Sequence, residues 1–296
     1  MELVKLRPAI KSAIWGGDYF QAFGKGESSK IISELWEFSM REDGPALIDS
    51  GLNKGKALKD VVTKEDFGTS IDKYPFFPIL VKLIDAKDKL SIQVHPSDEY
   101  ALKNENSFGK YEIWYILSCE KDAGIYIGLN NNYSKEEIKE KLYNNSIISA
   151  LNFVKVKPGD IYEIKPGTIH AIGAGVRILE IQQNSGLTYR LYDYNRLDKD
   201  GNPRELHLKK ALDVLDLSKF EQHSFKEPKN YFKIKFVELC DSELITKEDS
   251  FQALICLEGE GYLDDLKFKK FDTFFQSAST KVNLKGKGRF AIVSMK

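Results

Sequence analysis

Residues 90–96 read Leu-Ser-Ile-Gln-Val-His-Pro, and much of what the sequence indicates can be worked out from this segment. Every second residue is apolar, and the residues between them are Ser91, Gln93 and His95. This alternation is typical of a β-strand, on which side chains two residues apart share a face. The apolar face would enter a packed layer, while the amide oxygen of Gln93 and an imidazole nitrogen of His95 could bind one metal ion. The segment therefore predicts a strand that supplies half of a metal site.

Two further polar side chains stand on other segments with strand character. Glu112 begins an apolar run that ends at Leu117, and His170 follows the Pro-Gly turn at residues 166–167. The remaining histidines, His207 and His223, lie in a predicted helix and in a charged segment. In the alternative interpretation, His95 and His170 are structural and Glu112 is a solvated charge. The occurrence of all four residues on successive strand segments favours a metal site. Two oxygens and two nitrogens suit zinc or a similar divalent ion, and the predicted ligands are Gln93, His95, Glu112 and His170.

The composition of the 296 residues, with 42% hydrophobic and 30% charged side chains, is typical of a globular protein. Lys and Arg together number 44, as do Asp and Glu, so the formal net charge is zero. Such a chain has no general attraction for nucleic acid or an anionic membrane, and an anionic ligand must be bound by local cations. No stretch approaches the ~20 apolar residues of a membrane span. The three scattered cysteines, Cys119, Cys240 and Cys256, predict reduced thiols and a cytoplasmic protein.

Short strand-like runs separated by turn residues predict a mainly β fold. Residues 161–164 and 168–172 flank Pro166-Gly167, an arrangement typical of an antiparallel β-sandwich or barrel. A few amphipathic helices interrupt the pattern, and the clearest late one is predicted at residues 205–217. Strands resume after about residue 220 without a second set of metal-binding side chains. We therefore predict a metal-binding domain with helical insertions at residues 1–220, and a smaller C-terminal β-domain without metal ligands at residues 221–296.

At this level of detail the chain resembles the type I mannose-6-phosphate isomerases of the short bacterial form, within the cupin superfamily. The resemblance spans roughly the first two-thirds of the chain and is carried by Trp15–Gly17, Leu90–Pro96, Gly109–Leu117, Pro166–Gly175, Gln182–Ser185 and Tyr189–Tyr194. It implies a cupin-like jelly roll and a zinc-dependent isomerase. The implied reaction interconverts mannose 6-phosphate and fructose 6-phosphate through a cis-enediolate. The expected partner is thus a small phosphosugar, with neither nucleic acid nor membrane involved.

The resemblance also implies a role for individual residues. One zinc ion per chain would be held by the four predicted ligands. The implied catalytic residues are Arg190, Glu180 and Lys110. The implied contacts to the phosphate and the sugar are Ser91, Lys82 and Lys110. The sequence departs from the family pattern at Gly186, where many relatives have an aspartate, so catalysis here must manage without that carboxylate.

An aldose–ketose interconversion moves a proton between C1 and C2 and places negative charge on the sugar oxygens. A divalent cation and the permanently charged guanidinium of Arg190 are suited to stabilise that charge. Glu180 would need a pKa raised by burial to carry the proton near neutral pH. Lys82 interrupts an apolar run, where a lysine usually lies at an edge or extends its charge to solvent. Two alternatives stay open, an iron-dependent cupin oxygenase and a non-catalytic sugar-binding cupin module.

Overall fold

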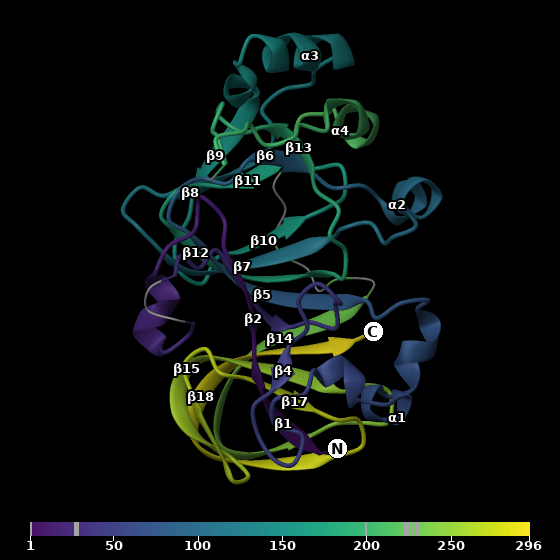
Figure 1. Ribbon diagram of the computed structural model, residues 1–296, viewed down its shortest axis with the longest axis vertical. Helices are drawn as coiled ribbons and strands as arrows, with labels where there is room; N and C mark the ends of the chain where they lie inside the picture. The colour runs from purple at the N-terminus through teal and green to yellow at the C-terminus, as the bar shows by residue number, and fades with distance from the viewer. Residues whose placement is uncertain (1, 27–29, 199, 222–224, 226–227, 229–230) are drawn as a thin grey trace.

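The structure, a computed structural model, describes residues 2–26, 30–198, 200–221, 225, 228 and 231–296. Its strands form three antiparallel sheets that stack as layers along the long axis of the molecule (Figure 1). The two termini lie close to the lowest layer in this view, and the helices α3 and α4 lie at the opposite end. The predicted mainly β, antiparallel architecture is therefore confirmed.

The seven-stranded sheet combines the C-terminal strands with two strands from the start of the chain. Its members in spatial order are β14 (Phe232–Ile245), β18 (Lys281–Met295), β15 (Gln252–Leu263), β17 (Thr273–Gln276), β1 (Leu3–Arg7) and β4 (Leu47–Ile48), and β16 (Leu266–Lys269) pairs with β15. Because β1 pairs directly with β17, strand pairing crosses the predicted boundary at residue 220. The division of the chain into two domains at that residue stays a prediction.

The other two sheets form the part of the molecule that holds the predicted site residues. The six-stranded sheet runs β10 (Ile161–Ile164), β7 (Glu112–Cys119), β12 (Val176–Gln183), β5 (Ile79–Ala86), β3 (Glu34–Phe38) and β2 (Ala9–Lys11). The five-stranded sheet runs β13 (Tyr189–Tyr192), β6 (Ile92–Val94), β11 (His170–Ile172), β8 (Gly124–Leu129) and β9 (Leu151–Lys155). Both are antiparallel, as expected for a sandwich.

The six-stranded sheet is the middle layer, and it is buried on both faces. On β12, Leu179 and Ile181 pack in the same cluster as Phe232 and Val293 of the seven-stranded sheet. Ile178 of the same strand points the other way and packs in a cluster with Ile125 of the five-stranded sheet. Burial on two faces explains why these strands read as nearly continuous apolar runs, without the alternation seen at residues 90–96.

Helices cover the outer face of the five-stranded sheet. Ile138 of α3 (Lys135–Tyr143) and Leu212 of α4 (Leu208–Val214) belong to one apolar cluster with residues of β6, β11 and β13. The other α-helices of the described residues are α1 (Lys64–Phe67), of four residues, and α2 (Asp98–Glu105), of eight. In the described part of the chain no helix is long and apolar enough to cross a membrane.

Two elements are shorter than the sequence predicts. The strand predicted at residues 90–96 is limited to Ile92–Val94, and His95 lies just beyond its end, where its carbonyl oxygen accepts from Gly167 N–H at 2.9 Å. The helix predicted at 205–217 begins only at Leu208. The residues before it are not helical, and the N–H of His207 donates instead to the carbonyl oxygen of Arg190, at 2.8 Å.

Candidate active site

Polar side chains form two cross-strand rows between the six-stranded and five-stranded sheets. In the six-stranded sheet the register aligns Trp114, Glu180, Lys82 and Trp36, which lie on β7, β12, β5 and β3. In the five-stranded sheet the register aligns His170, Gln93 and Arg190, which lie on β11, β6 and β13. Directly opposed residues of neighbouring strands share a face. Residues far apart in the chain are thereby brought to one place by sheet register.

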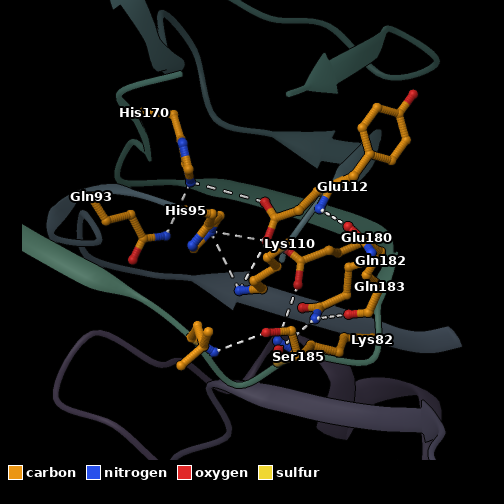
Figure 2. A network of polar contacts seen from close by, with 12 residues as sticks. Lys82, Gln93, His95, Lys110, Glu112, His170, Glu180, Gln182, Gln183 and Ser185 are labelled. Carbon is orange, nitrogen blue, oxygen red and sulfur yellow. Dashed lines mark hydrogen bonds and ion pairs between the residues drawn. The ribbon is translucent and has the colours of Figure 1, made fainter. Parts of the chain in front are cut away.

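The four predicted metal ligands converge beside these rows (Figure 2). His95, Glu112 and His170 are buried, and one ligand atom from each lies within 4.8 Å of the others. Glu112 Oε1 is 3.2 Å from His95 Nε2, and Glu112 Oε2 is 4.0 Å from His170 Nε2. The amide nitrogen of Gln93 lies 3.3 Å from His170 Nε2. The structure therefore brings together all four residues that the sequence singled out.

The donor atoms of this cluster fit a divalent cation. His170 Nδ1 lies 2.8 Å from the carbonyl oxygen of Thr168 and donates to it. The other ring nitrogen, Nε2, therefore carries no proton, and its lone pair is available to a metal ion. Glu112 Oε1 is buried and accepts no well-aligned hydrogen bond from the described residues. A half-turn of the Gln93 amide presents its oxygen in place of its nitrogen. Two imidazoles, one carboxylate and one amide oxygen form a ligand set that zinc accepts.

The protonation states of the cluster also suit a metal ion. The ammonium of Lys110 lies 3.0 Å from Glu112 Oε1 and 3.4 Å from His95 Nε2, so a positive charge already sits against these atoms. Burial, reinforced by the charge of Lys110, lowers the pKa of His95 to about 3 and keeps the imidazole neutral. Burial alone would raise the pKa of Glu112, but Lys110 and His95 outweigh it and hold the pKa well below its usual value. Neutral imidazole and ionised carboxylate are the protonation states that bind metals.

Trp114 connects the metal-ligand cluster to the second carboxylate of the site. Its indole N–H lies 3.0 Å from Glu112 Oε2 and equally 3.0 Å from Glu180 Oε2. Its ring also packs edge-on against His170, with ring centroids 5.4 Å apart. One side chain thus contacts one predicted catalytic group, Glu180, and two predicted metal ligands, Glu112 and His170.

Replacing Trp114 with phenylalanine is therefore expected to weaken metal binding. The ring contact with His170 remains, while Glu112 loses the donor that fixes its second oxygen. Partners of this kind typically contribute about 10–100-fold in metal affinity or activity, and we expect a loss in that range. Zinc titration against a competing chelator would measure it. Unchanged zinc affinity in a folded W114F protein would show that the indole N–H does not orient the carboxylate.

Lys82 lies between two carboxylates at the centre of the six-stranded row. Its ammonium is 3.1 Å from Glu180 Oε1 and 3.5 Å from Glu34 Oε2, and the residue is 6% exposed. Burial lowers the pKa of Lys82, but the charges of Glu180 and Glu34 outweigh this and raise it. The expectation for a lysine in an apolar run, an edge or solvent-directed position, is wrong here because the side chain faces the site. Glu34, held by the indole N–H of Trp36 at 2.6 Å, was missed by sequence reasoning.

A cavity of about 540 Å³ lies between the two rows. Its lining includes every predicted catalytic and substrate-contacting residue, namely Lys82, Ser91, Lys110, Glu180 and Arg190, together with Gln93. Gly186 also lines it, and a Cβ added there would lie 3.2 Å from the guanidinium Nη2 of Arg41. Arg41 is itself bound to Asp43, whose Oδ1 lies 2.8 Å from Arg41 Nε and which also lines the cavity. The side of the cavity near Gly186 therefore carries an arginine–aspartate pair.

Arg190 is held in place by a segment that the sequence placed in a helix. Its Nε lies 3.3 Å from Ser91 Oγ, and its Nη1 donates to the carbonyl oxygen of Glu205 at 2.7 Å. The backbone N–H of Arg190 donates to Nδ1 of His207 at 3.2 Å. Arg204 and His207 both line the cavity and were missed. The pattern Arg-Glu-Leu-His offers no signal of its own; only its pairing with β13 places it here.

Comparison with known proteins agrees with this geometry. Residues 3–122 match the family described as phosphomannose isomerase type I, catalytic domain. The mannose-6-phosphate isomerase ManA of Bacillus subtilis is 38% identical over 269 residues, covering 86% of this chain and 85% of that protein. The mannose-6-phosphate isomerase of Streptococcus mutans is 39% identical over 217 residues, covering 72% of this chain and 68% of that protein.

Solved structures support the same assignment. The crystal structure of mannose 6-phosphate isomerase from Bacillus subtilis superposes with a TM-score of 0.87 at 32% identity and covers 99% of both chains. A phosphomannose isomerase from Salmonella typhimurium has a TM-score of 0.81 at 18% identity over the full length of both chains, which shows a shared fold alone. Identity near 38% over most of both proteins is decisive for the family. The chain belongs to the type I phosphomannose isomerase family and is an isomerase.

Proposed function

We propose that this chain is a zinc-dependent mannose-6-phosphate isomerase that forms fructose 6-phosphate, and the reverse, through a cis-enediolate. The observation that carries the proposal is the convergence of His95, Glu112 and His170 beside a cavity lined by Arg190 and Glu180. A buried cluster of neutral imidazoles and one carboxylate has no evident structural purpose. Its place at the cavity suits chemistry on a bound molecule.

Gln93, His95, Glu112 and His170 would hold the zinc ion, which when bound supplies a Lewis acid that polarises oxygens of the sugar. The chain supplies a rigid and largely dry setting for them. All four come from strands or strand ends, and three of the four are fully buried. Preorganised groups of this kind need little rearrangement as charge develops on the substrate.

Arg190 is the group best placed to stabilise negative charge on the sugar. Its guanidinium stays protonated at any working pH, so it can act without exchanging protons. Contacts to Ser91 and Glu205 restrict its orientation, and they leave other N–H groups free to donate into the cavity. Arg190 follows Gln93 and His170 in one cross-strand row, so its charge acts beside the proposed metal.

Glu180 is our candidate for the group that carries the proton between C1 and C2. It lines the cavity, and its two oxygens contact Lys82 and Trp114. Burial raises the pKa of Glu180 and the charge of Glu112 adds to the rise, while Lys82 opposes it. A carboxyl with a raised pKa is better matched to proton transfer near neutral pH than an ordinary one.

The E180Q variant is expected to lose about 10²–10⁴-fold in kcat, the range typical of a general base. A base acts when deprotonated, so the wild-type rate should rise with pH through the pKa of Glu180. That acidic limb should disappear in E180Q. The E34Q variant is the matched comparison, because it removes the other carboxylate beside Lys82 and should keep the limb. Full turnover by E180Q would remove Glu180 from the mechanism.

Lys110, Lys82 and Ser91 line the same cavity, and we propose that they contact the substrate. Each lysine is already paired with a carboxylate, so its remaining N–H groups suit neutral sugar hydroxyls. Lys110 also stands beside the proposed metal ligands and stays our candidate for a catalytic role there. Both ammonium groups are buried, which makes their hydrogen bonds to a ligand stronger than they would be in water.

One experiment separates this function from the two alternatives. Purified protein with its metal content determined would be incubated with mannose 6-phosphate, while fructose 6-phosphate and oxygen uptake are followed. Zinc, product formation and no oxygen uptake are expected for the isomerase. Iron with oxygen uptake would indicate the cupin oxygenase, and binding without product would indicate a sugar-binding module.

We also propose that different sheets have different roles, and that the protein is cytoplasmic. The proposed catalytic groups and the candidate metal-ligand cluster of the described residues both belong to the six-stranded and five-stranded sheets and the turns next to them. The C-terminal β-region, residues 221–296, would then serve as a packing module without metal ligands. Cys119, Cys240 and Cys256 are all free thiols, which agrees with a reducing cytoplasm.

A further inference from the structure

Arg204 lines the cavity on the side away from the metal-ligand cluster. It belongs to the segment 204–207, which lies beside the edge strand β13. Two hydrogen bonds join them: the backbone N–H of His207 donates to the carbonyl oxygen of Arg190, and the backbone N–H of Arg190 donates to His207 Nδ1. The cross-strand row of the five-stranded sheet passes from His170 on β11 to Gln93 on β6 and Arg190 on β13. Segment 204–207 lies one strand spacing beyond Arg190 in this row. Neighbouring strands are about 4.8 Å apart, which places the segment roughly 10–15 Å from His170.

The guanidinium of Arg204 is fixed by Asp193. Nε lies 2.7 Å from Asp193 Oδ2 and Nη2 lies 2.5 Å from Oδ1, a two-pronged contact that holds the group in one plane. The Asp193 side chain is 5% exposed and is absent from the cavity lining, whereas the Arg204 side chain is 19% exposed and belongs to it. The carboxylate thus lies behind the guanidinium. Two of the five N–H groups bind Asp193, and the other three have no hydrogen-bond partner among the described residues.

Apart from the proposed zinc site, this outer corner is the part of the cavity where the positive charge of the described residues is least balanced by buried carboxylates. Lys82 and Lys110 are each paired with buried carboxylates, so they add little net charge to the inner part. In the corner, Asp193 is shared between Arg204 and Arg196, and Arg190 has no ion-pair partner among the described residues.

Among the other carboxylates near this corner, Glu105 is bound to Lys210 at 2.7 Å, and Asp88 and Glu205 are largely in water. Asp88, which contacts Arg196, has a 53% exposed side chain, and that of Glu205 is 82% exposed. Solvent screens charges of this kind, so they offset the arginines only weakly. A dianion entering the cavity would find its counter-charge in this corner.

We propose that Arg204, held by Asp193, binds the phosphate of the sugar phosphate. This rests on the proposed function, and it reassigns the phosphate contact that the family resemblance implied for Lys82 and Lys110. The phosphate on C6 is at the opposite end of the substrate from C1 and C2. With those two carbons beside the metal ligands, the phosphate points away from His170, toward segment 204–207. A guanidinium with a free edge matches phosphate geometry.

Asp193 is then a positioning residue, because it touches Arg204 and not the substrate. Its other partner provides a matched control. Arg196 Nη2 lies 2.6 Å from Asp193 Oδ1, and Arg196 is outside the lining of the cavity. The two arginines share one carboxylate and differ in which of them faces the cavity.

The test uses the zinc-loaded full chain and two readouts, mannose 6-phosphate kinetics and calorimetric binding of inorganic phosphate. In R204M we expect KM to rise roughly 10–100-fold with kcat within about twofold, because one charge-assisted contact made equally in ground and transition states is lost. Phosphate binding should weaken by a similar factor. In R196M, which removes an arginine that does not line the cavity, both quantities should change less than in R204M. In R204K, which keeps the charge and loses the fork, the changes should be intermediate.

The double variant D193N/R204M tests the positioning role. If Asp193 acts through Arg204, the single substitution D193N should raise KM, and the double variant should have the same KM as R204M. A folded R204M protein with unchanged KM and unchanged phosphate binding would overturn the proposal, and so would equal effects in R196M. Arg204-dependent phosphate binding by a wild-type protein that does not isomerise mannose 6-phosphate would support the anion site while refuting the proposed function.

Discussion

The E112Q variant is expected to lose its zinc and nearly all isomerase activity. Glu112 is the one anionic member of the four-residue set, and both of its oxygens face the histidines. Glutamine keeps the shape but removes the charge that neutralises the cation. Residues that only orient a ligand contribute about 10–100-fold, so loss of the ligand itself should exceed that. Metal content and kcat/KM of the purified variant would measure the effect.

The same change should reduce stability, because Lys110 would be left as a buried ammonium without its carboxylate. Removing one partner of a buried ion pair typically costs about 3–5 kcal/mol, which urea unfolding would detect. E163Q is a suitable control, since Glu163 lies on the paired strand β10, accepts from Tyr111 Oη at 2.9 Å and is outside the cavity lining. Wild-type zinc content in folded E112Q would contradict the metal assignment.

The R190M variant is expected to lose about 10²–10³-fold in kcat, as is typical when one preorganised donor to developing charge is removed. KM should change less, because the contact strengthens as the sugar oxygens become charged. R190K should recover part of the rate, since lysine keeps the charge but lacks the planar fork that reaches both Ser91 and Glu205. Steady-state kinetics on all three proteins would decide.

This result also separates Arg190 from Arg204, since the first should act mainly on kcat and the second on KM. A near-normal kcat in R190M, with melting temperature and zinc content unchanged, would refute a role in stabilising the enediolate. A KM effect alone would mean that Arg190 binds substrate without assisting the chemistry.

The residues at the centre of the site could be predicted from the sequence because local patterns carry them. The alternation at residues 90–96 puts Ser91, Gln93 and His95 on one face, and few other histidines compete with His170. Their types alone limit the metal chemistry. The mainly β class follows from short runs and Pro-Gly turns in the same local way, and the structure confirms it.

The rest depends on register and long-range pairing, which no local pattern encodes. Glu34 and Trp36 join the site only because β3 pairs with β5 and places Trp36 beside Lys82. Arg204 and His207 join it because the backbone of His207 binds that of Arg190, and the predicted helix begins only at Leu208. Strand β1 lies in the C-terminal sheet for the same reason.

The central claim is that zinc bound by the Gln93, His95, Glu112 and His170 set supports isomerisation in this cavity. The most direct measurement is the rate of fructose 6-phosphate formation by chelator-treated protein as Zn²⁺ is titrated back. We predict no turnover in the stripped protein and a rate that rises linearly to a plateau at one zinc per chain. Undiminished turnover in protein shown to be free of metal would contradict the account.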